Sequence, residues 1–470
     1  MLKQAQYQAS RKSCTTVLVG KAVTADGSTM IARNEDGGET PLPQRFVWIE
    51  ANQPNTYQSE LTDFAMTLPE KSFSYTSTPD AITGSGIWAA GGINSQNVAM
   101  TASETITTNE RVLAFDPLND AGIGEADFTT LVLPYIDSAR AGVERLGALL
   151  EAYGTYESNG IAFADREEIW YLETIGGHSW VAVKIPDNAA VLASNRFNID
   201  VVNLNGPDVL YADAVKSFIE QQSETDVIDY EHINLRHYFG SYLDKDKVYN
   251  NPRVWLGHKL MGLDVSNVDP TEQDLPFLVY PDQKLGVHDV ESILSAYYAD
   301  TDFDVYHNET ETGTPVYRPI GMNRNEESHI LQLRADVPDS VAGIHWLGFG
   351  PNVFNAFVPY FANVNDTPAV IRDTPGQADV QYTYWLMRNI AMIADADFDF
   401  YQPMVQAFQE RMQHAGDLFL AENQLAISVA ELTTQNQQMA DKYLQAANAL
   451  LNELLNKGTG RMHLRFPMAD

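Results

Sequence analysis

Ser13-Cys14-Thr15-Thr16-Val17-Leu18-Val19-Gly20 holds the only cysteine of a 470-residue chain, at the start of a β-branched run. Such a run predicts a buried strand. A single cysteine is most often a small, inert core residue. Cys14 could instead act as a nucleophile if the residues before it were cut away, because it would then begin the mature chain. The rest of the sequence has to distinguish these two interpretations.

A second strand is predicted at residues 28–34, and Asp26-Gly27 before it is typical of a hairpin turn. This strand runs into a polar cluster, Arg33-Asn34-Glu35-Asp36-Gly37-Gly38. An antiparallel hairpin brings the start of its first strand beside the end of its second. We therefore expect Arg33 and Asp36 at the end of the sheet where Cys14 lies. On sequence alone, the two could also form an ordinary surface ion pair.

The remaining sequence changes between strand and helix patterns. Further strands are predicted at residues 45–51, 86–94, 98–105, 160–165, 168–173, 180–184, 190–195, 329–334 and 341–347. Helical spacing of apolar residues spans 127–153, and helices are predicted near 378–394, 404–421 and 423–456. Between residues 200 and 320 the pattern is irregular.

The chain carries 63 acidic and 30 basic side chains, a formal net charge of −33. This balance disfavours nucleic acid and anionic membranes as partners, since both require a basic surface. One cysteine excludes an intramolecular disulfide. No window reaches the ~18 apolar residues of a membrane span, and the first residues lack the apolar stretch of a secretory signal. We therefore expect a cytoplasmic protein.

Other catalytic signatures are missing from the sequence. The ten histidines include no His-Glu-x-x-His pair, and one cysteine cannot form a thiolate zinc site. A glycine-flanked serine elbow and a phosphate-binding loop are absent as well. We therefore expect no metal and no cofactor, although dispersed residues could still assemble a metal site.

Thiol chemistry remains, and it requires a thiolate and a base or positive charge nearby. Cleavage of the Ser13–Cys14 bond would free the α-amine of Cys14, whose ordinary pKa is about 7.7–8.0. That amine could then deprotonate its own thiol. A polar cluster beside the start of the strand would orient the amine and bind the substrate, and Arg33 and Asp36 are placed for this.

Several ordered blocks closely resemble the bacterial dipeptidase A family, whose members are cysteine peptidases of the N-terminal-nucleophile hydrolase superfamily and relatives of the secernins. The blocks are residues 14–21 (CTTVLVGK), 26–38 (DGSTMIARNEDGG), 99–106 (AMTASETI), 170–178 (WYLETIGGH), 318–325 (RPIGMNRN) and 346–351 (WLGFGP). The similarity covers most of the chain up to residue 365 and, more loosely, the helical tail.

The resemblance implies an α+β fold, a four-layer αββα sandwich with a helical C-terminal region. It also implies metal-independent hydrolysis of dipeptides through Cys14, after removal of a leader at residues 1–13. The catalytic domain is then expected at residues 14–375, with insertions around 200–320. A helical region at residues 376–470 would pack on this core.

The same resemblance implies the site residues. Arg33 and Asp36 match an Arg-x-x-Asp element of the wider superfamily. Asn195 matches a strand-end asparagine that holds the oxyanion, although it could also be a plain turn residue. Bile-salt hydrolases carry a second asparagine where this chain has Glu104, so Asn94 or a backbone N–H is expected to be the second donor. Glu104, unless it simply faces solvent, or Asp36 would bind the free ammonium of a dipeptide.

Two other functional classes stay open on sequence alone. One is an amidase of the same superfamily that acts on N-acyl amides such as bile salts or penicillins, and the other is a non-catalytic, secernin-like protein. The expected partners are dipeptide substrates. Apolar helices after residue 400 hint at a homo-oligomer.

Overall fold

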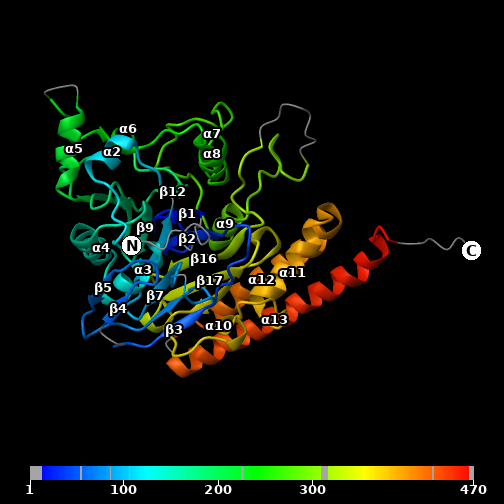
Figure 1. The fold of residues 1–470 in the computed structure, drawn as a ribbon. Helices are drawn as coiled ribbons and strands as arrows, with labels where there is room; N and C mark the ends of the chain where they lie inside the picture. The colour runs from blue at the N-terminus through cyan, green and yellow to red at the C-terminus, as the bar shows by residue number, and fades with distance from the viewer. Residues whose placement is uncertain are drawn as a thin grey trace, which may run out of the picture.

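The computed structural model describes residues 13–52, 56–84, 86–104, 106–223, 227–307, 316–425 and 428–464. The expected leader therefore lies outside the described residues, except for Ser13. Two antiparallel sheets occupy the middle of the molecule and stack face to face (Figure 1). The described residues begin in the first of these sheets, at the strand that carries the cysteine.

The first sheet has six strands among the described residues, in the order β12-β1-β2-β16-β17-β18. They are β1 (Ser13–Val19), β2 (Thr29–Asp36), β12 (Ala190–Ala193), β16 (Asn325–Leu333), β17 (Gly343–Phe349) and β18 (Val358–Phe361). The predicted hairpin is confirmed, because β1 pairs antiparallel with β2. The register sets Cys14 opposite Glu35 and Ser13 opposite Asp36.

The second sheet has eight strands in the described part of the chain, in the order β14-β11-β10-β9-β8-β7-β6-β3. They are β3 (Val47–Ile49), β6 (Tyr75–Ser77), β7 (Gly91–Asn94), β8 (Ala99–Glu104), β9 (Asn159–Ala164), β10 (Ile169–Thr174), β11 (Trp180–Ile185) and β14 (Val209–Tyr211). Two short ribbons lie outside the main sheets, β4 (Thr56–Gln58) with β5 (Ala65–Thr67), and β13 (Val201–Val202) with β15 (Ile233–Asn234). The predicted second hairpin is confirmed as β7 paired with β8.

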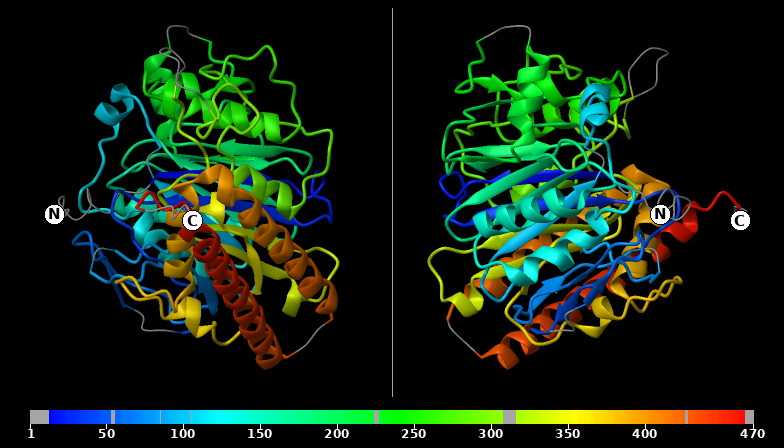
Figure 2. Two further views of the ribbon diagram at one scale, coloured as in Figure 1. Left: turned by 90° about the vertical axis from the view of Figure 1, so that its right-hand side faces the viewer. Right: turned by 60° about the vertical axis from the view of Figure 1, so that its left-hand side comes forward.

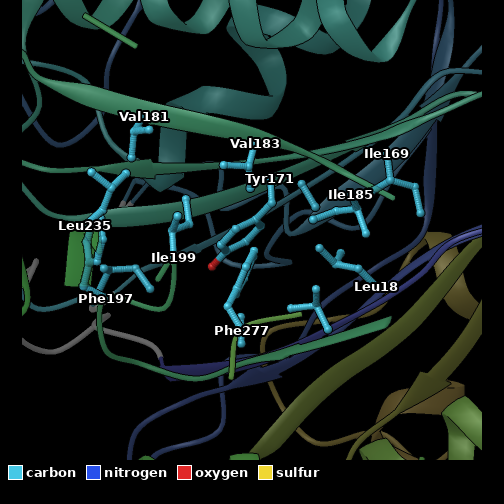
Figure 3. Packing of buried hydrophobic residues seen from close by; sticks show 14 of the residues in the cluster. Leu18, Ile169, Tyr171, Val181, Val183, Ile185, Phe197, Ile199, Leu235 and Phe277 are labelled. Carbon is cyan, nitrogen blue, oxygen red and sulfur yellow. The ribbon is translucent and has the colours of Figure 1, made fainter. Parts of the chain in front are cut away.

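The core between the sheets follows from the alternation of side chains along each strand. Leu18 and Ile31 of the first sheet pack against Ile169 and Tyr171 of the second, as Figure 3 shows for Leu18. Each fully buried aliphatic side chain of this kind contributes roughly 1.5–3 kcal/mol. Gly91 allows the close approach of the two sheets, since a Cβ there would lie 2.8 Å from the ring of His329.

Helices cover both outer faces of the sheet pair (Figure 2). On the second sheet lie α3 (Glu125–Val132) and α4 (Ala139–Tyr153), with the 3₁₀ turn Leu133–Tyr135 between them. Ser138 caps α4 by accepting from the N–H of Ala141, and Gly154 ends it at a φ of 72°. On the first sheet lie α8 (Asn251–Leu260) and α9 (Val287–Leu294), together with the C-terminal helices. This order of layers confirms the predicted αββα sandwich.

The C-terminal helices are α11 (Thr383–Asp395), α12 (Phe398–Glu422) and α13 (Val429–Gly458). They pack against β17 and β18. Helix α12 begins six residues earlier than predicted and passes through Pro403, because burial of Phe398 and Tyr401 offsets the backbone hydrogen bond that proline removes. Asn436 of α13 binds the edge strand by accepting from Phe361 N and donating to Phe361 O, both at 2.9 Å.

The remaining helices lie in loops between these elements. They are α2 (Glu110–Phe115), α5 (Ala214–Gln222), α6 (Leu235–Phe239), α7 (Asp246–Tyr249) and α10 (Ala369–Arg372), with 3₁₀ turns at Asp339–Val341, Asn352–Phe354 and Thr459–Arg461. Helices α5 to α8 gather at one end of the molecule, at the top of Figure 1, where the sequence pattern is irregular. Within the described ranges, no helix has the length and apolar character needed to cross a membrane.

Candidate active site

Cys14 is the second residue of β1 and is buried, with 2% of its surface exposed. Because side chains alternate along a strand, the thiol shares the inner face of the sheet with Thr16 and Leu18. The neighbouring strand β2 places Glu35 opposite Cys14, and the Sγ atom lies 4.0 Å from Glu35 Oε2. The thiol therefore faces ionisable side chains rather than an apolar core.

Arg33 supplies the positive charge beside this thiol. Its Nη2 atom lies 2.5 Å from Glu125 Oε1 of α3 and also forms an ion pair with Glu35. Its Nη1 atom donates to Ala90 O at 2.8 Å. Burial lowers the pKa of Arg33, but the charges of Cys14 and Glu125 raise it by more, so the net pKa lies above its ordinary value. The guanidinium therefore stays charged between the thiol and two buried carboxylates.

Asp36 lies on the opposite face of β2 from Arg33, because residues three apart on a strand point in opposite directions. It forms an ion pair with Arg318 and accepts from Asn325 Nδ2. Arg318 Nη2 also donates to Ser13 Oγ at 3.1 Å. The structure thus brings Arg33 and Asp36 to the end of the sheet where Cys14 lies, but they do not pair with each other. Arg33 faces the thiol, and Asp36 is linked through Arg318 to Ser13.

Asn195 follows strand β12 and is held by Arg253 of α8. Arg253 Nη2 donates to Asn195 Oδ1 at 2.8 Å, and Nη1 donates to the carbonyl oxygen of Cys14 at 2.7 Å. Asn250 Nδ2 donates to Asn195 O at 3.0 Å. Since the carbonyl oxygen of the Asn195 amide faces Arg253, its NH₂ group is the donor on the other side of the amide. Asn195 and Cys14 therefore share one guanidinium.

Sequence reasoning missed Arg253 and Glu125. Arg253 lies 239 residues from Cys14 along the chain, and Glu125 lies 92 residues from Arg33. No local pattern marks either residue, since each reaches the site only through the packing of its helix. Glu35 could have been found, because residues two apart on a strand share a face, and this places Glu35 with Arg33.

Asn94 serves a turn and does not face Cys14. Its Nδ2 donates to Leu133 O and Ile136 O, both at 2.8 Å. Its Oδ1 accepts from the backbone N–H groups of Gln96 and Val98. The amide is therefore fully used in the connection between β7 and β8. Glu104 ends β8, where its backbone pairs with β9, and its side chain lies outside the described part of the structure.

A cavity of about 260 Å³ opens beside Ser13. Its wall includes the residue before Cys14, the candidate oxyanion donor, side chains at and just before α7, and a side chain of the loop before β16: Ser13, Asn195, Lys245, Asp246, Tyr249 and Arg324. A second cavity of about 600 Å³ shares Thr107 and Leu243 with it. Ser13 therefore lines an accessible cavity, whereas the thiol of the next residue, Cys14, is buried.

Two groups among the described side chains could offer ligand atoms to a metal ion, each with those atoms within 4.8 Å of one another. One is Cys14 with Glu35 and Glu125, whose carboxylates both form ion pairs with Arg33. The other comprises Glu327, His329 and His345, a combination of ligand types that zinc accepts. There His329 Nδ1 lies 3.0 Å from Glu327 Oε2, and burial holds the pKa of His345 well below its usual range.

Comparison with known proteins shows which family the chain belongs to. Residues 13–411 match the model of peptidase family C69. A probable dipeptidase B from Lactococcus lactis is 47% identical over 97% of this chain and 98% of its own length. Dipeptidase A from Lactobacillus helveticus is 41% identical over 97% of this chain and 99% of its own length.

A solved structure, that of penicillin V acylase from Agrobacterium tumefaciens, is more distant. It covers 74% of this chain and 86% of its own chain, with 12% sequence identity and a TM-score of 0.36. Sequence similarity over the full length, not this shape comparison, assigns the family. The chain belongs to peptidase family C69.

Proposed function

We propose that this protein is a cysteine dipeptidase in which Cys14 is the nucleophile. The observation that carries the proposal is the position of the Ser13–Cys14 bond. Ser13 lines an accessible cavity, while the thiol of Cys14 lies beside the charged guanidinium of Arg33. A cation beside a thiol favours the thiolate, which is the reactive form. Relatives that are named dipeptidases match this chain over nearly their whole length, and this supports dipeptides as the substrates.

In this proposal, removal of residues 1–13 produces the active enzyme, whether Cys14 cleaves its own leader or another peptidase does. The cut frees the α-amine of Cys14, whose ordinary pKa of about 7.7–8.0 suits a base near neutral pH. That amine lies on the same residue as the thiol, so no distant histidine is needed. Asp36 and Arg318 are positioned at Ser13 to orient the new N-terminus.

Peptide hydrolysis then proceeds in two halves. The amine takes the thiol proton, and Sγ forms a bond to the carbonyl carbon of the first residue of the dipeptide. Asn195 and a backbone N–H donate to the oxyanion that forms. The C–N bond breaks, and the leaving amino acid takes the proton from the Cys14 ammonium. Water, deprotonated by the same amine, then cleaves the thioester and releases the first amino acid.

A dipeptidase has to recognise the free ammonium of its substrate. We assign this role to a carboxylate near the nucleophile, with Glu104 and Asp36 as the candidates from the sequence. Asp36 is already engaged by Arg318 and Asn325, so Glu104 is the better candidate. The chemistry uses no metal, because thiolate, amine and oxyanion donors account for every proton and electron pair.

The intact mass of the purified, active protein tests the central step. We expect the mass of residues 14–470, and an active sample that retains Met1–Ser13 would contradict the mechanism. Cys14→Ala should abolish turnover of dipeptides. Activity should survive EDTA and metal analysis should find no stoichiometric ion. Loss of activity that zinc restores would instead implicate Glu327, His329 and His345.

The same preparation separates the other two classes. A dipeptidase should hydrolyse free dipeptides and reject their N-acetylated forms, whereas an N-acyl amidase should prefer the blocked forms. A non-catalytic protein should keep its N-terminus, and its Cys14 should not react with iodoacetamide. A preference for blocked dipeptides would replace the proposal with the amidase, and an unprocessed, unreactive protein would replace it with the non-catalytic class.

A further inference from the structure

The cavity at Ser13 differs in charge from the molecule as a whole. The chain carries a formal net charge of −33, yet Lys245 and Arg324 both line this cavity. Among the described residues, neither forms a salt bridge with a carboxylate. Basic neighbours do, since Lys247 pairs with Asp244 and Arg388 pairs with Glu326. Two cations that form no ion pair with a described carboxylate therefore line one small cavity.

The acidic residue in the cavity wall, Asp246, is hydrogen-bonded to two other residues of the same wall. Asp246 is buried, and it accepts from Asn250 Nδ2 at 2.6 Å and from Leu243 N at 3.0 Å. The leader cannot supply a partner either, because residues 1–13 include no aspartate or glutamate. The charge of Lys245 also acts on Asp246, which offsets part of the positive charge, but Asp246 forms no ion pair with either cation.

Tyr249, in the cavity wall, lies beside three cations. Lys245 Nζ lies 4.3 Å from the centre of its ring, and the guanidinium carbons of Arg318 and Arg253 lie 4.9 and 5.2 Å from it. Burial raises the pKa of Tyr249, but the charges of Arg318 and Arg253 lower it by more, to about 8. Arg318 and Arg253 do not line the cavity, but their charges reach a group in its wall and would add to the attraction of Lys245 and Arg324 for an anionic ligand.

We propose that Lys245 and Arg324 form a subsite for the free carboxylate at the C-terminal end of a dipeptide. The inference rests on the proposed function, since it names the part of the substrate that the cavity binds. The carboxylate lies about one residue, roughly 3.5 Å of extended chain, beyond the bond that is cut. Ser13 and Asn195 both border the cavity, so a leaving residue placed there would lie next to the reacting carbonyl.

This subsite explains how the enzyme would select dipeptides over longer peptides. A tripeptide cut at its first bond places a neutral amide, not a carboxylate, at the position of the two cations. Its own carboxylate lies one residue farther away. A cavity of about 260 Å³ is small, and ligand pockets of roughly 300–1,000 Å³ are usual for larger molecules. The neighbouring cavity of about 600 Å³ adds space, so the charge of the two cations is what favours a single leaving amino acid.

The test compares Lys245→Gln, Arg324→Gln and the double variant on a dipeptide and on the C-terminal amide of the same dipeptide. Each single variant should lower kcat/KM for the free dipeptide about 10-fold, the effect of one charge-assisted hydrogen bond, mainly through KM. The double variant should lose about 100-fold. Turnover of the amide should change less than about 3-fold in all three variants. Intact mass confirms that each variant has lost residues 1–13.

Lys247→Gln is the matched control, because Lys247 is an exposed lysine two residues away that pairs with Asp244. It should leave both substrates unaffected. Equal losses on dipeptide and amide, or no loss on the dipeptide, would overturn the subsite. A wild-type enzyme that cleaves both substrates equally well would also overturn it and leave the dipeptidase proposal standing. A processed wild-type protein that cleaves no dipeptide would reject the proposed function itself.

Discussion

Arg253 Nη2 donates to Asn195 Oδ1 across 2.8 Å, although the two residues are 58 positions apart in the chain. The other terminal nitrogen of Arg253 donates to the carbonyl oxygen of Cys14 at 2.7 Å. One guanidinium therefore sets the position of the candidate nucleophile and the direction of the candidate oxyanion donor. Arg253 is fully buried, so solvent does not compete for these hydrogen bonds.

Arg253→Lys should lower kcat about 100-fold and change KM little, because misdirecting one oxyanion donor costs about this much. Asn195→Ala should cause a similar loss. Because both substitutions remove the same interaction, the double variant should be no slower than the worse single variant. Steady-state kinetics on processed protein measure this. Independent, additive losses would mean that Arg253 does not act through Asn195.

Arg33→Gln should destabilise the protein by about 3–5 kcal/mol, because it leaves Glu35 and Glu125 buried without their cation. Adding Glu125→Gln should recover part of this loss, since one uncompensated charge is removed as well. Urea denaturation measures the free energy of unfolding. Arg140→Gln is the control, because its pairing with Glu144 is exposed and should contribute under about 0.5 kcal/mol. A double variant less stable than Arg33→Gln alone would contradict this account.

Asp36→Asn should slow the release of residues 1–13 about 10-fold. Arg318 connects Asp36 to Ser13 Oγ, and the substitution removes the charge-assisted part of that link. Intact mass, recorded over time on freshly purified protein, follows the release. Glu39→Gln changes an exposed carboxylate three residues away and should release the leader at the wild-type rate. An unchanged rate in Asp36→Asn would remove Asp36 from the processing step.

His288 should contribute stability that depends on pH. Its Nε2 lies 3.0 Å from Asp417 Oδ1 of α12 and its Nδ1 lies 3.2 Å from Glu291 Oε2. Burial lowers the pKa of His288, but Glu291 and Asp417 raise it by more, to about 9. The unfolded value is about 6.5. The stabilisation is therefore fully present below pH ~6.5 and is lost as the pH rises through about 9.

His288→Gln should accordingly reduce the free energy of unfolding by about 1 kcal/mol at pH 6, after allowing for solvent screening of a ring that is one-third exposed. At pH 9.5 the difference from wild type should nearly vanish. Urea denaturation at the two pH values measures both. His232→Gln is the control, because the pairing of His232 with Asp229 is exposed to solvent and should contribute under about 0.5 kcal/mol. A loss of unfolding free energy that is larger at pH 9.5 than at pH 6 would contradict the assigned pH dependence.

Local patterns predicted the central hairpin because its two strands carry their own signals. The run from Cys14 to Val19 is β-branched and apolar, and Asp26-Gly27 marks the turn that joins it to β2. Antiparallel pairing then brings Arg33 near Cys14, as the register confirms. The alternation of side chains also puts Arg33 and Asp36 on opposite faces of β2. From the sequence we expected both at the Cys14 end of the sheet but did not separate them by face.

By itself, the sequence determined the strand that carries Cys14, its hairpin partner, the class of fold and the family. Each of these depends on residues close together in the chain or on similarity along its whole length. Only the tertiary structure decided that Arg253 holds Asn195, that Glu125 meets Arg33, and that Lys245 and Arg324 share a cavity at Ser13. These contacts arise from the packing of distant helices and loops, and spacing along the chain does not encode where such segments come together.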